Sequence, residues 1–345
     1  MSAIARALWN PIVAKEYRSR MRTWRSPLAL MIYILLLGGL GWATFASMVS
    51  ASQSQFGGPA QNYGQVLFQN LVIFQMLLLA FITPAVTAGA ISGERERQTI
   101  DLLFVTLIPP FSIIWGKLLA SISFILLLLV LSVPIFSLVF LFGGIELDQV
   151  FYAFVLMAVT ALTLGCLGIA FSTWLRRTLP ATVAAYAAAF LLVAGTYVFG
   201  FLFPSPADPA ATTPPAPPLV TYLGPIVPLL TIATNSPLVG FGIRYPNNFG
   251  PGGGGYSCSS SNNGPQSCVQ LVPAGPAKVV GPGFTQVGQT TGTVLPSGPF
   301  KGWQYWEASA AMQLAICLVA LAWSALLLPP VQRLRFSLRR KPVSP

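Results

Sequence analysis

Long apolar runs alternate with short polar and basic segments along this chain. Six of the runs are long enough to cross a lipid bilayer, at residues 28–48, 66–91, 113–142, 150–174, 180–203 and 308–331. A helix needs about 20 mainly apolar residues to span the hydrocarbon core, because each residue adds about 1.5 Å of length. The pattern therefore predicts an all-α membrane protein with six transmembrane helices.

A further apolar stretch, residues 219–243, complicates this count. Pro225, Pro228 and Pro237 interrupt its helical hydrogen-bond ladder. A crossing here would also move the basic C-terminal tail to the side opposite the other basic segments. We therefore expect a short helix-turn in the outer leaflet or at its interface, and not a seventh span.

The charged residues are few and strongly asymmetric in position. The chain is 54% hydrophobic and 8% charged, with a net charge of +11, whereas soluble domains carry about 25% charged residues. Sixteen of the 19 Lys and Arg residues fall in segments that six spans would place on one side. The bias towards positive charge on the inner side predicts cytoplasmic N- and C-termini. The basic residues flank apolar runs without aromatic interleaving, which argues against nucleic-acid binding.

The predicted spans divide the chain into five regions. The loop between the fifth and sixth spans is rich in Pro, Gly, Ser and Asn, and we expect it to be extracytoplasmic. The regions are a cytoplasmic amphipathic elbow helix (1–27), transmembrane helices 1 to 5 (28–203), the extracytoplasmic loop (204–307), transmembrane helix 6 (308–331) and a basic cytoplasmic tail (332–345).

Cysteine and histidine usage limits the chemistry. The chain has no histidine, which excludes His-ligated haem and His-based zinc sites. Cys258 and Cys268 lie in the polar outer loop, where oxidation is permitted, so we expect a disulfide between them. A metal site is the poorer interpretation, because two thiols without His or nearby acids make an incomplete ligand shell. Cys166 and Cys317 lie in apolar runs, and we interpret them as small buried residues.

Residues 9–26 have the pattern of an amphipathic helix at a membrane surface. One face carries Val13, Tyr17, Met21 and Trp24, and the other carries Lys15, Arg18, Arg22 and Arg25. The alternative is an ordinary basic flank that anchors the first span. In both cases the basic side chains meet anionic headgroups.

The densest mixed charge lies after the second span, in Glu94, Arg95, Glu96, Arg97 and Asp101. At helical spacing Arg97 and Asp101 are i,i+4 partners, with Ile100, Leu103 and Phe104 forming an apolar edge. Pro109 and Pro110 would end such a helix. A short charged helix between two spans could dock on another protein. It could also be a solvated loop that only marks topology, and the spacing alone does not decide.

Three motifs resemble permease subunits of ABC transporters of the type 2 exporter class. They are NPIVAKEYRSRMR, ITPAVTAGAISGERERQTIDLLFVT and GKLLAS at 116–121, and they lie in the first 140 residues. The resemblance implies an N-terminal elbow helix and a coupling helix at 94–106 that inserts into a separate ATPase. It implies coupling roles for Glu94, Arg95, Glu96, Arg97, Thr99 and Asp101. Leu107-Ile108-Pro109-Pro110 departs from the family, which more often has a single Pro followed by a small polar residue.

The absence of an ATP-binding motif is informative in view of this resemblance. No G-x-x-x-x-G-K-[ST] sequence occurs, so we expect no ATP site and no enzymatic activity in this chain. ATP and Mg would bind a cytoplasmic ABC ATPase, present in two copies. A second permease subunit, the same or homologous, would complete the pathway in a bacterial or archaeal plasma (inner) membrane.

The predicted spans lack central charged residues, which disfavours ion-driven transport. Lys117 lies near the end of a span, where we expect it to snorkel to water. Scattered polar residues favour an amphipathic, lipid-like or peptide cargo over a small ion, although they could equally be helix-packing contacts: Gln69, Asn70, Gln75, Thr83 and Thr87. The alternative function is a non-transporting membrane anchor or assembly subunit whose outer loop binds a partner.

Overall fold

The computed structural model describes residues 24–54, 63–98, 110–203, 205–206, 218–234, 243–244, 256–259, 267–270 and 300–327. The α-helices are α3 (Arg25–Ser54), α4 (Tyr63–Thr87), α5 (Ser92–Glu96), α7 (Pro110–Ser137), α8 (Leu147–Trp174), α9 (Thr178–Phe190), α10 (Thr196–Leu202), α11 (Ile226–Thr234) and α12 (Tyr305–Leu327). The 3₁₀ segments are η1 (Leu138–Phe142) and η3 (Leu219–Leu223), and η2 (Leu191–Gly195) is a π-helix. Four short strands are β1 (Ser205–Pro206), β2 (Ile243–Arg244), β3 (Tyr256–Ser259) and β4 (Ser267–Gln270).

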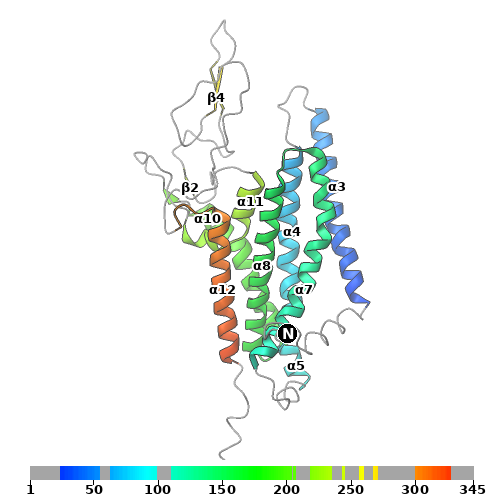
Figure 1. The fold of residues 1–345 in the computed structure, drawn as a ribbon, viewed down its shortest axis with the longest axis vertical. Coiled ribbons are helices and arrows are strands. Elements are labelled where there is room, and N and C mark those ends of the chain that lie inside the picture. Colours follow the sequence, from blue (N-terminus) through cyan, green and yellow to red (C-terminus); the bar gives the residue numbers. More distant parts are fainter. Residues whose placement is uncertain are drawn as a thin grey trace, which may run out of the picture.

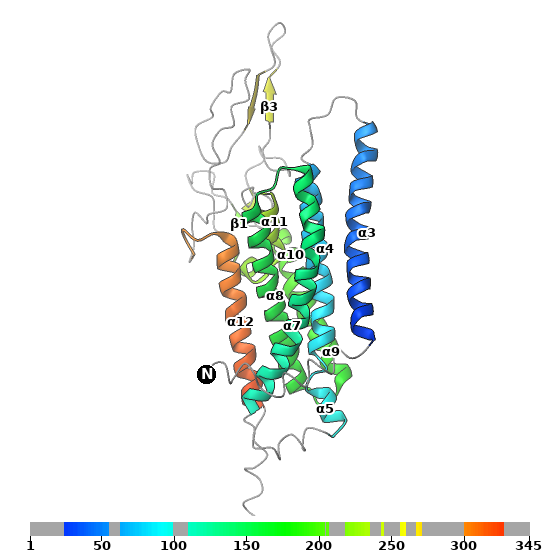
Figure 2. The ribbon, with the colours of Figure 1, turned by 45° about the vertical axis from the view of Figure 1, so that its right-hand side comes forward.

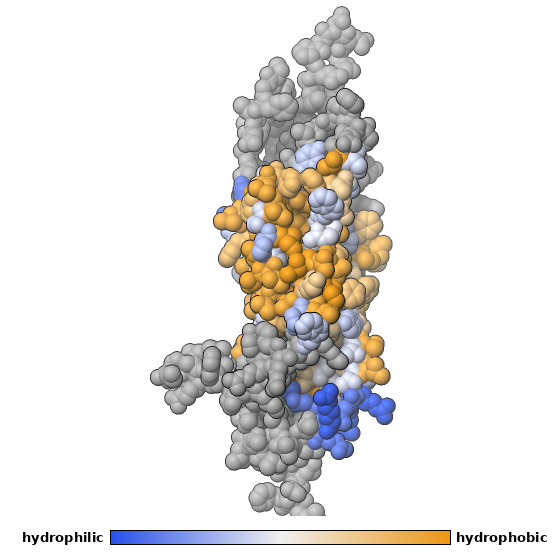
Figure 3. Space-filling model, turned by 90° about the vertical axis from the view of Figure 1, so that its right-hand side faces the viewer, coloured by the Kyte–Doolittle hydropathy of each residue, from blue (hydrophilic) through white to orange (hydrophobic). Residues whose placement is uncertain are grey.

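Among the described residues, six helical segments are long and apolar enough to cross a bilayer, which confirms the predicted all-α, six-span fold. They stand along the long axis of the molecule (Figure 1) and are Pro27–Ser50, Tyr63–Glu96, Ile114–Phe142, Leu147–Trp174, Thr178–Leu202 and Tyr305–Leu327. Apolar side chains cover the middle of the visible face, and strongly hydrophilic ones gather at the end that carries α5 (Figure 3). We call this end of the bundle the α5 end.

Helix α8 is the centre of the bundle and the most buried of the six spans. It contacts α4, α7, α9, α11 and α12. A Cβ added at Gly168 would collide with the Oγ1 atom of Thr87 on α4, so glycine is required for this close approach. By contrast, α3 stands at the edge of the bundle (Figure 2), and its helix contacts are with α4 and α7.

Helix α11 is short, as the prolines of this stretch predicted, and it is buried. All residues from Val227 to Ala233 are buried, and α11 packs against α4, α8 and α12. The side chain of Gln65 donates to the carbonyl oxygen of Thr234 at 2.8 Å, and Ser309 donates to the carbonyl of Gly224 at 3.3 Å. These contacts hold α11 at the end of the bundle opposite α5 (Figure 1).

Several polar residues inside the bundle join neighbouring helices. Gln75 on α4 donates to Ser132 on α7 at 3.3 Å, and Thr160 on α8 donates to Gln313 on α12 at 2.8 Å. The polar side chains of Gln75, Thr83 and Thr87 are completely buried, whereas Asn70 is exposed. Interhelical hydrogen bonds of this kind are helix-packing contacts, so the packing interpretation is supported for Gln75. Thr87 instead donates to the carbonyl oxygen of Thr83 within α4.

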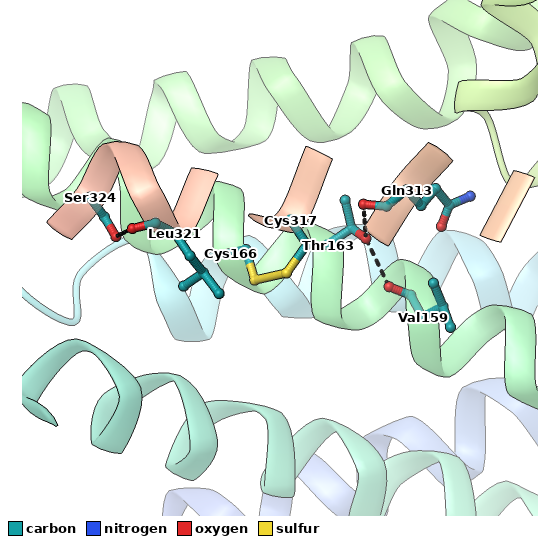
Figure 4. Close-up of a disulfide and its surroundings, with 7 residues drawn as sticks. All are labelled: Val159, Thr163, Cys166, Gln313, Cys317, Leu321 and Ser324. Carbon is teal, nitrogen blue, oxygen red and sulfur yellow. Dashed lines mark hydrogen bonds between the residues drawn. A yellow bond between two sulfur atoms is a disulfide. The ribbon is translucent and has the colours of Figure 1, made fainter. Parts of the chain in front are cut away.

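The structure joins Cys166 on α8 to Cys317 on α12 by a disulfide, with the two Cα atoms 5.4 Å apart (Figure 4). Both side chains are buried, as predicted, but the sequence did not indicate the pairing. In the segment between α11 and α12, β3 and β4 form an antiparallel pair in which the Cα of Cys258 lies opposite that of Cys268. This register suits the predicted disulfide, which stays a prediction.

Candidate functional site: the α5 clamp

The charged segment after the second span forms a short helix that lies across the ends of three others. Helix α4 ends at Thr87, a turn follows, and α5 runs only from Ser92 to Glu96. Gln98 then has a φ of 57°, a left-handed conformation that ends a right-handed helix. Asp101, the expected i,i+4 partner of Arg97, lies outside the described residues, so this pairing stays a prediction.

The start of α5 is capped by a serine from α8. The first N–H groups of a helix have no partner within the helix. The Oγ atom of Ser172 accepts hydrogen bonds from the backbone N–H groups of Ile91 and Ser92, at 3.0 and 2.9 Å. It also donates to the Oγ atom of Ser92 at 3.2 Å. Because Ser92 and Ser172 are both completely buried, α5 is fixed against the end of α8.

Lys117 joins α5 to the start of α7. Its Nζ atom lies 2.8 Å from an Oε1 oxygen of Glu94 and donates to the carbonyl oxygen of Ala90 at 2.7 Å. The Lys117 side chain is only 4% exposed, and a buried ammonium group is stable only with such partners. The expectation that Lys117 snorkels to water is therefore wrong, because a carboxylate and a carbonyl inside the protein satisfy it.

The next two residues of α5 hold the turn between α8 and α9. A guanidinium nitrogen of Arg95 donates to the carbonyl oxygen of Thr173, at the end of α8, at 3.3 Å. The two carboxylate oxygens of Glu96 accept from the backbone N–H and the Oγ1 hydroxyl of Thr178, at 2.8 and 2.9 Å. Each charge thus meets the helix end that it favours, a cation at a C-terminus and an anion at an N-terminus.

These contacts define the α5 clamp: Ser92, Glu94, Arg95 and Glu96 on one side, and Lys117, Ser172, Thr173 and Thr178 on the other. The clamp joins α5 to α7, α8 and α9 through hydrogen bonds and one ion pair. Within the described residues, no group of three His, Cys, Asp or Glu side chains could hold a metal ion. These polar contacts can hold α5, α7, α8 and α9 together, so that the four helices move as a unit.

A family model described as an ABC-2 family transporter protein matches residues 10–245, more than half of the chain. The chain belongs to the ABC-2 transporter family. The matched segment includes the α5 clamp and five of the six spans, and it identifies the protein as a transporter permease. Permeases of this family work in general with an ABC ATPase. No curated protein sequence matches this chain at a significant level.

The structure describes part of the residue set predicted from the sequence. Glu94, Arg95 and Glu96 contact helices of the permease itself, whereas Arg97 is exposed at the C-cap of α5. Thr99 and Asp101 lie outside the described residues, as do Lys15, Arg18 and Arg22 of the predicted elbow, while Arg25 is the first residue of α3. A role in docking an ATPase remains a prediction for all six coupling residues.

Sequence reasoning missed the partners that receive these side chains. Two signals could have found them. Lys117 is the only charged residue in the third apolar run, which marks it as requiring an acidic partner. The Arg176-Arg177 break between two spans places Thr178 at the start of a helix, where an acidic side chain is favoured. Ser172 gave no such signal, because a serine near the end of an apolar run is common.

Proposed function

We propose that this permease is the transmembrane subunit of an ATP-driven exporter, and that α5 receives movement from a separate cytoplasmic ATPase. The observation that supports the proposal is the α5 clamp, in which a helix of five residues is bonded to α7, α8 and α9. A segment held so closely to three spans cannot move without them.

The clamp suggests which helices move as a unit. A push on α5 acts on α7 through Glu94 and Lys117, and on α8 and α9 through Arg95 and Glu96. Helix α12 follows α8, because a disulfide and two buried hydrogen bonds join them. The resulting movement of packed helices would alternate the pathway between inward-open and outward-open states.

The rest of the assembly follows from charge and family membership. The excess of basic residues beside α5 supports a cytoplasmic position for this end and for both chain termini. Two ATPase subunits, carrying ATP and Mg, would act on two permease subunits, the same or homologous, in a bacterial or archaeal inner membrane. The cargo proposed is amphipathic or lipid-like, because the spans carry no central charge that would bind an ion.

Copurification tests this proposal. The full-length permease is extracted in mild detergent, its attached subunits are identified by mass spectrometry, and ATP hydrolysis by the complex is measured. We expect a copurifying ABC ATPase, and we expect Arg97→Glu to weaken its retention, because the exposed charge beside α5 is reversed. Lys301→Glu is the matched control, since Lys301 is exposed at the opposite end of the bundle. A permease that retains no ATPase, or that retains it equally with Arg97→Glu, overturns the proposal.

A further inference from the structure

An apolar groove runs between α8 and α12 at the α5 end of the bundle. Its volume is about 250 Å³, and every side chain that lines it is apolar or aromatic. Four lining residues come from α8 and four from α12, each set at i, i+3, i+4 and i+7: Leu167, Ala170, Phe171 and Trp174, with Ile316, Val319, Ala320 and Trp323. This spacing places each set along one helix face, so the groove follows the helix axes.

The groove has two different ends. Seven residues separate its first and last positions on each helix, a length of about 10 Å at 1.5 Å per residue. Cys166 and Cys317, the disulfide-bonded pair, lie next to Leu167 and Ile316 and fix the helix spacing at one end. At the other end lie Trp174 and Trp323, which are 57% and 52% exposed.

The position of the tryptophans relates the groove to the bilayer. Trp174 is the last residue of α8, and Trp323 lies four residues before the end of α12. Tryptophan is enriched at the level of the lipid headgroups, where its ring is partly in the apolar phase. The groove therefore extends from headgroup level into the hydrocarbon region. Arg176 and Arg177, both exposed, follow Trp174 and Leu175 in the turn before α9.

We infer that this groove binds one acyl chain of an anionic phospholipid, whose headgroup is held by Arg176 and Arg177. An apolar channel about 10 Å long that opens at headgroup level suits the upper part of an acyl chain. Two consecutive exposed arginines favour a phosphate-containing headgroup of net negative charge. A transmembrane helix of a partner is about 10–12 Å in diameter and too wide for this volume.

The test measures the lipids that remain bound to the full-length permease. The protein is reconstituted in vesicles of equal parts phosphatidylcholine and phosphatidylglycerol and extracted in mild detergent. Bound lipids are then counted by native mass spectrometry. We expect at least a threefold excess of phosphatidylglycerol over phosphatidylcholine on the unaltered protein. An equal ratio overturns the inference.

Two sets of variants distinguish the acyl-chain site in the groove from the headgroup site at the arginines. Arg176 and Arg177 lie in an exposed turn. The double variant Arg176→Gln, Arg177→Gln should bind phosphatidylglycerol and phosphatidylcholine in equal numbers. Ala170→Phe fills the groove and should lower the number of bound lipids of both kinds. The controls are Lys301→Gln, at the other end of the bundle, and Ala43→Phe, exposed on α3; neither should change the counts.

Each result decides the matter. A retained excess of phosphatidylglycerol in the double arginine variant overturns the headgroup site. Unchanged lipid counts with Ala170→Phe overturn the acyl-chain site. This comparison requires that Ala170→Phe melts at the same temperature as the Ala43→Phe control. If Ala170→Phe melts lower, Ala320→Phe fills the groove from α12 and gives the same decision.

Discussion

The carboxylate of Glu96 accepts hydrogen bonds from both the backbone nitrogen and the hydroxyl of Thr178, a residue 82 positions further along the chain. Glu96 is the last residue of α5, and Thr178 is the first of α9. One side chain therefore satisfies two donors at the start of another helix, where the helix dipole also favours a negative charge. This contact connects the end of the second span directly to the start of the fifth span.

The Glu96–Thr178 contact predicts a loss of coupling without a loss of assembly. In the complex with the ATPase, Glu96→Ala should retain the partner but reduce the permease-dependent stimulation of ATP hydrolysis several-fold. Thr178→Val removes the hydroxyl and keeps the N–H, so its effect should be smaller. The double variant should resemble Glu96→Ala alone, because both substitutions break the same contact. Fully additive effects, or normal stimulation with Glu96→Ala, would contradict the assignment.

The ion pair between the buried Lys117 and the partly exposed Glu94 predicts a specific pattern of stability. Lys117→Met removes the ammonium group that contacts the Glu94 carboxylate and the Ala90 carbonyl, and it should destabilise the protein by about 2 kcal/mol. Glu94→Gln combined with Lys117→Met should recover part of the loss, because no charge remains uncompensated. Thermal unfolding of the purified permease in detergent measures both. Lys301→Met, at an exposed position, is the control, and an equal loss in the single and double variants would refute the pairing.

The sequence predicted the elements of this fold better than the contacts between them. Hydropathy located all six spans within a few residues, because a bilayer requires long apolar runs whatever their packing. The charges after the second apolar run also predicted a short helix at 94–106; α5 overlaps its first residues, and the rest lies outside the described residues. The sequence did not predict that Lys117 lies against Glu94 and Ala90. Such contacts depend on how each helix is rotated about its axis, and residue spacing along one chain does not determine the rotation between helices.

The same limit applies to the ends of α5 and to the buried cysteines. Gln98 adopts a left-handed conformation that few residues other than Gly and Asn favour, so its sequence gave no stop signal. Cys166 and Cys317 lie 151 residues apart in two apolar runs that looked alike. Their pairing depends on α12 packing beside α8, which the order of the spans does not specify.

The close approach of α4 and α8 predicts that Gly168 cannot be enlarged. Gly168→Ala places a methyl group against the Oγ1 atom of Thr87 and should cost about 1–3 kcal/mol of unfolding free energy. Thr87→Ala combined with Gly168→Ala makes room for the methyl group and should recover most of the loss. Gly39→Ala is the matched control, because no atom lies within 4 Å of the added Cβ. Melting in detergent distinguishes these variants, and a harmless Gly168→Ala would show that the two helices are further apart.

The register of β3 and β4 predicts a disulfide between Cys258 and Cys268 in the membrane-inserted protein. Residues directly opposite each other in an antiparallel pair have Cα atoms about 4.5–5.5 Å apart, within the range of about 4.4–6.8 Å that a disulfide requires. Mass spectrometry of peptides from unreduced protein should recover the two cysteines in one linked peptide. Alkylation of both thiols in unreduced, oxidised protein would contradict the prediction.

The most direct test of the central claim is a photo-crosslink from the exposed end of α5. The photoreactive amino acid p-benzoylphenylalanine replaces Arg97 in one variant and Lys301, at the opposite end of the bundle, in another. Illumination in intact membranes should link position 97 to an ATP-binding protein and leave position 301 without that product. Crosslinking of the ATP-binding protein from position 301, or its absence from position 97 in an assembled complex, would contradict the account.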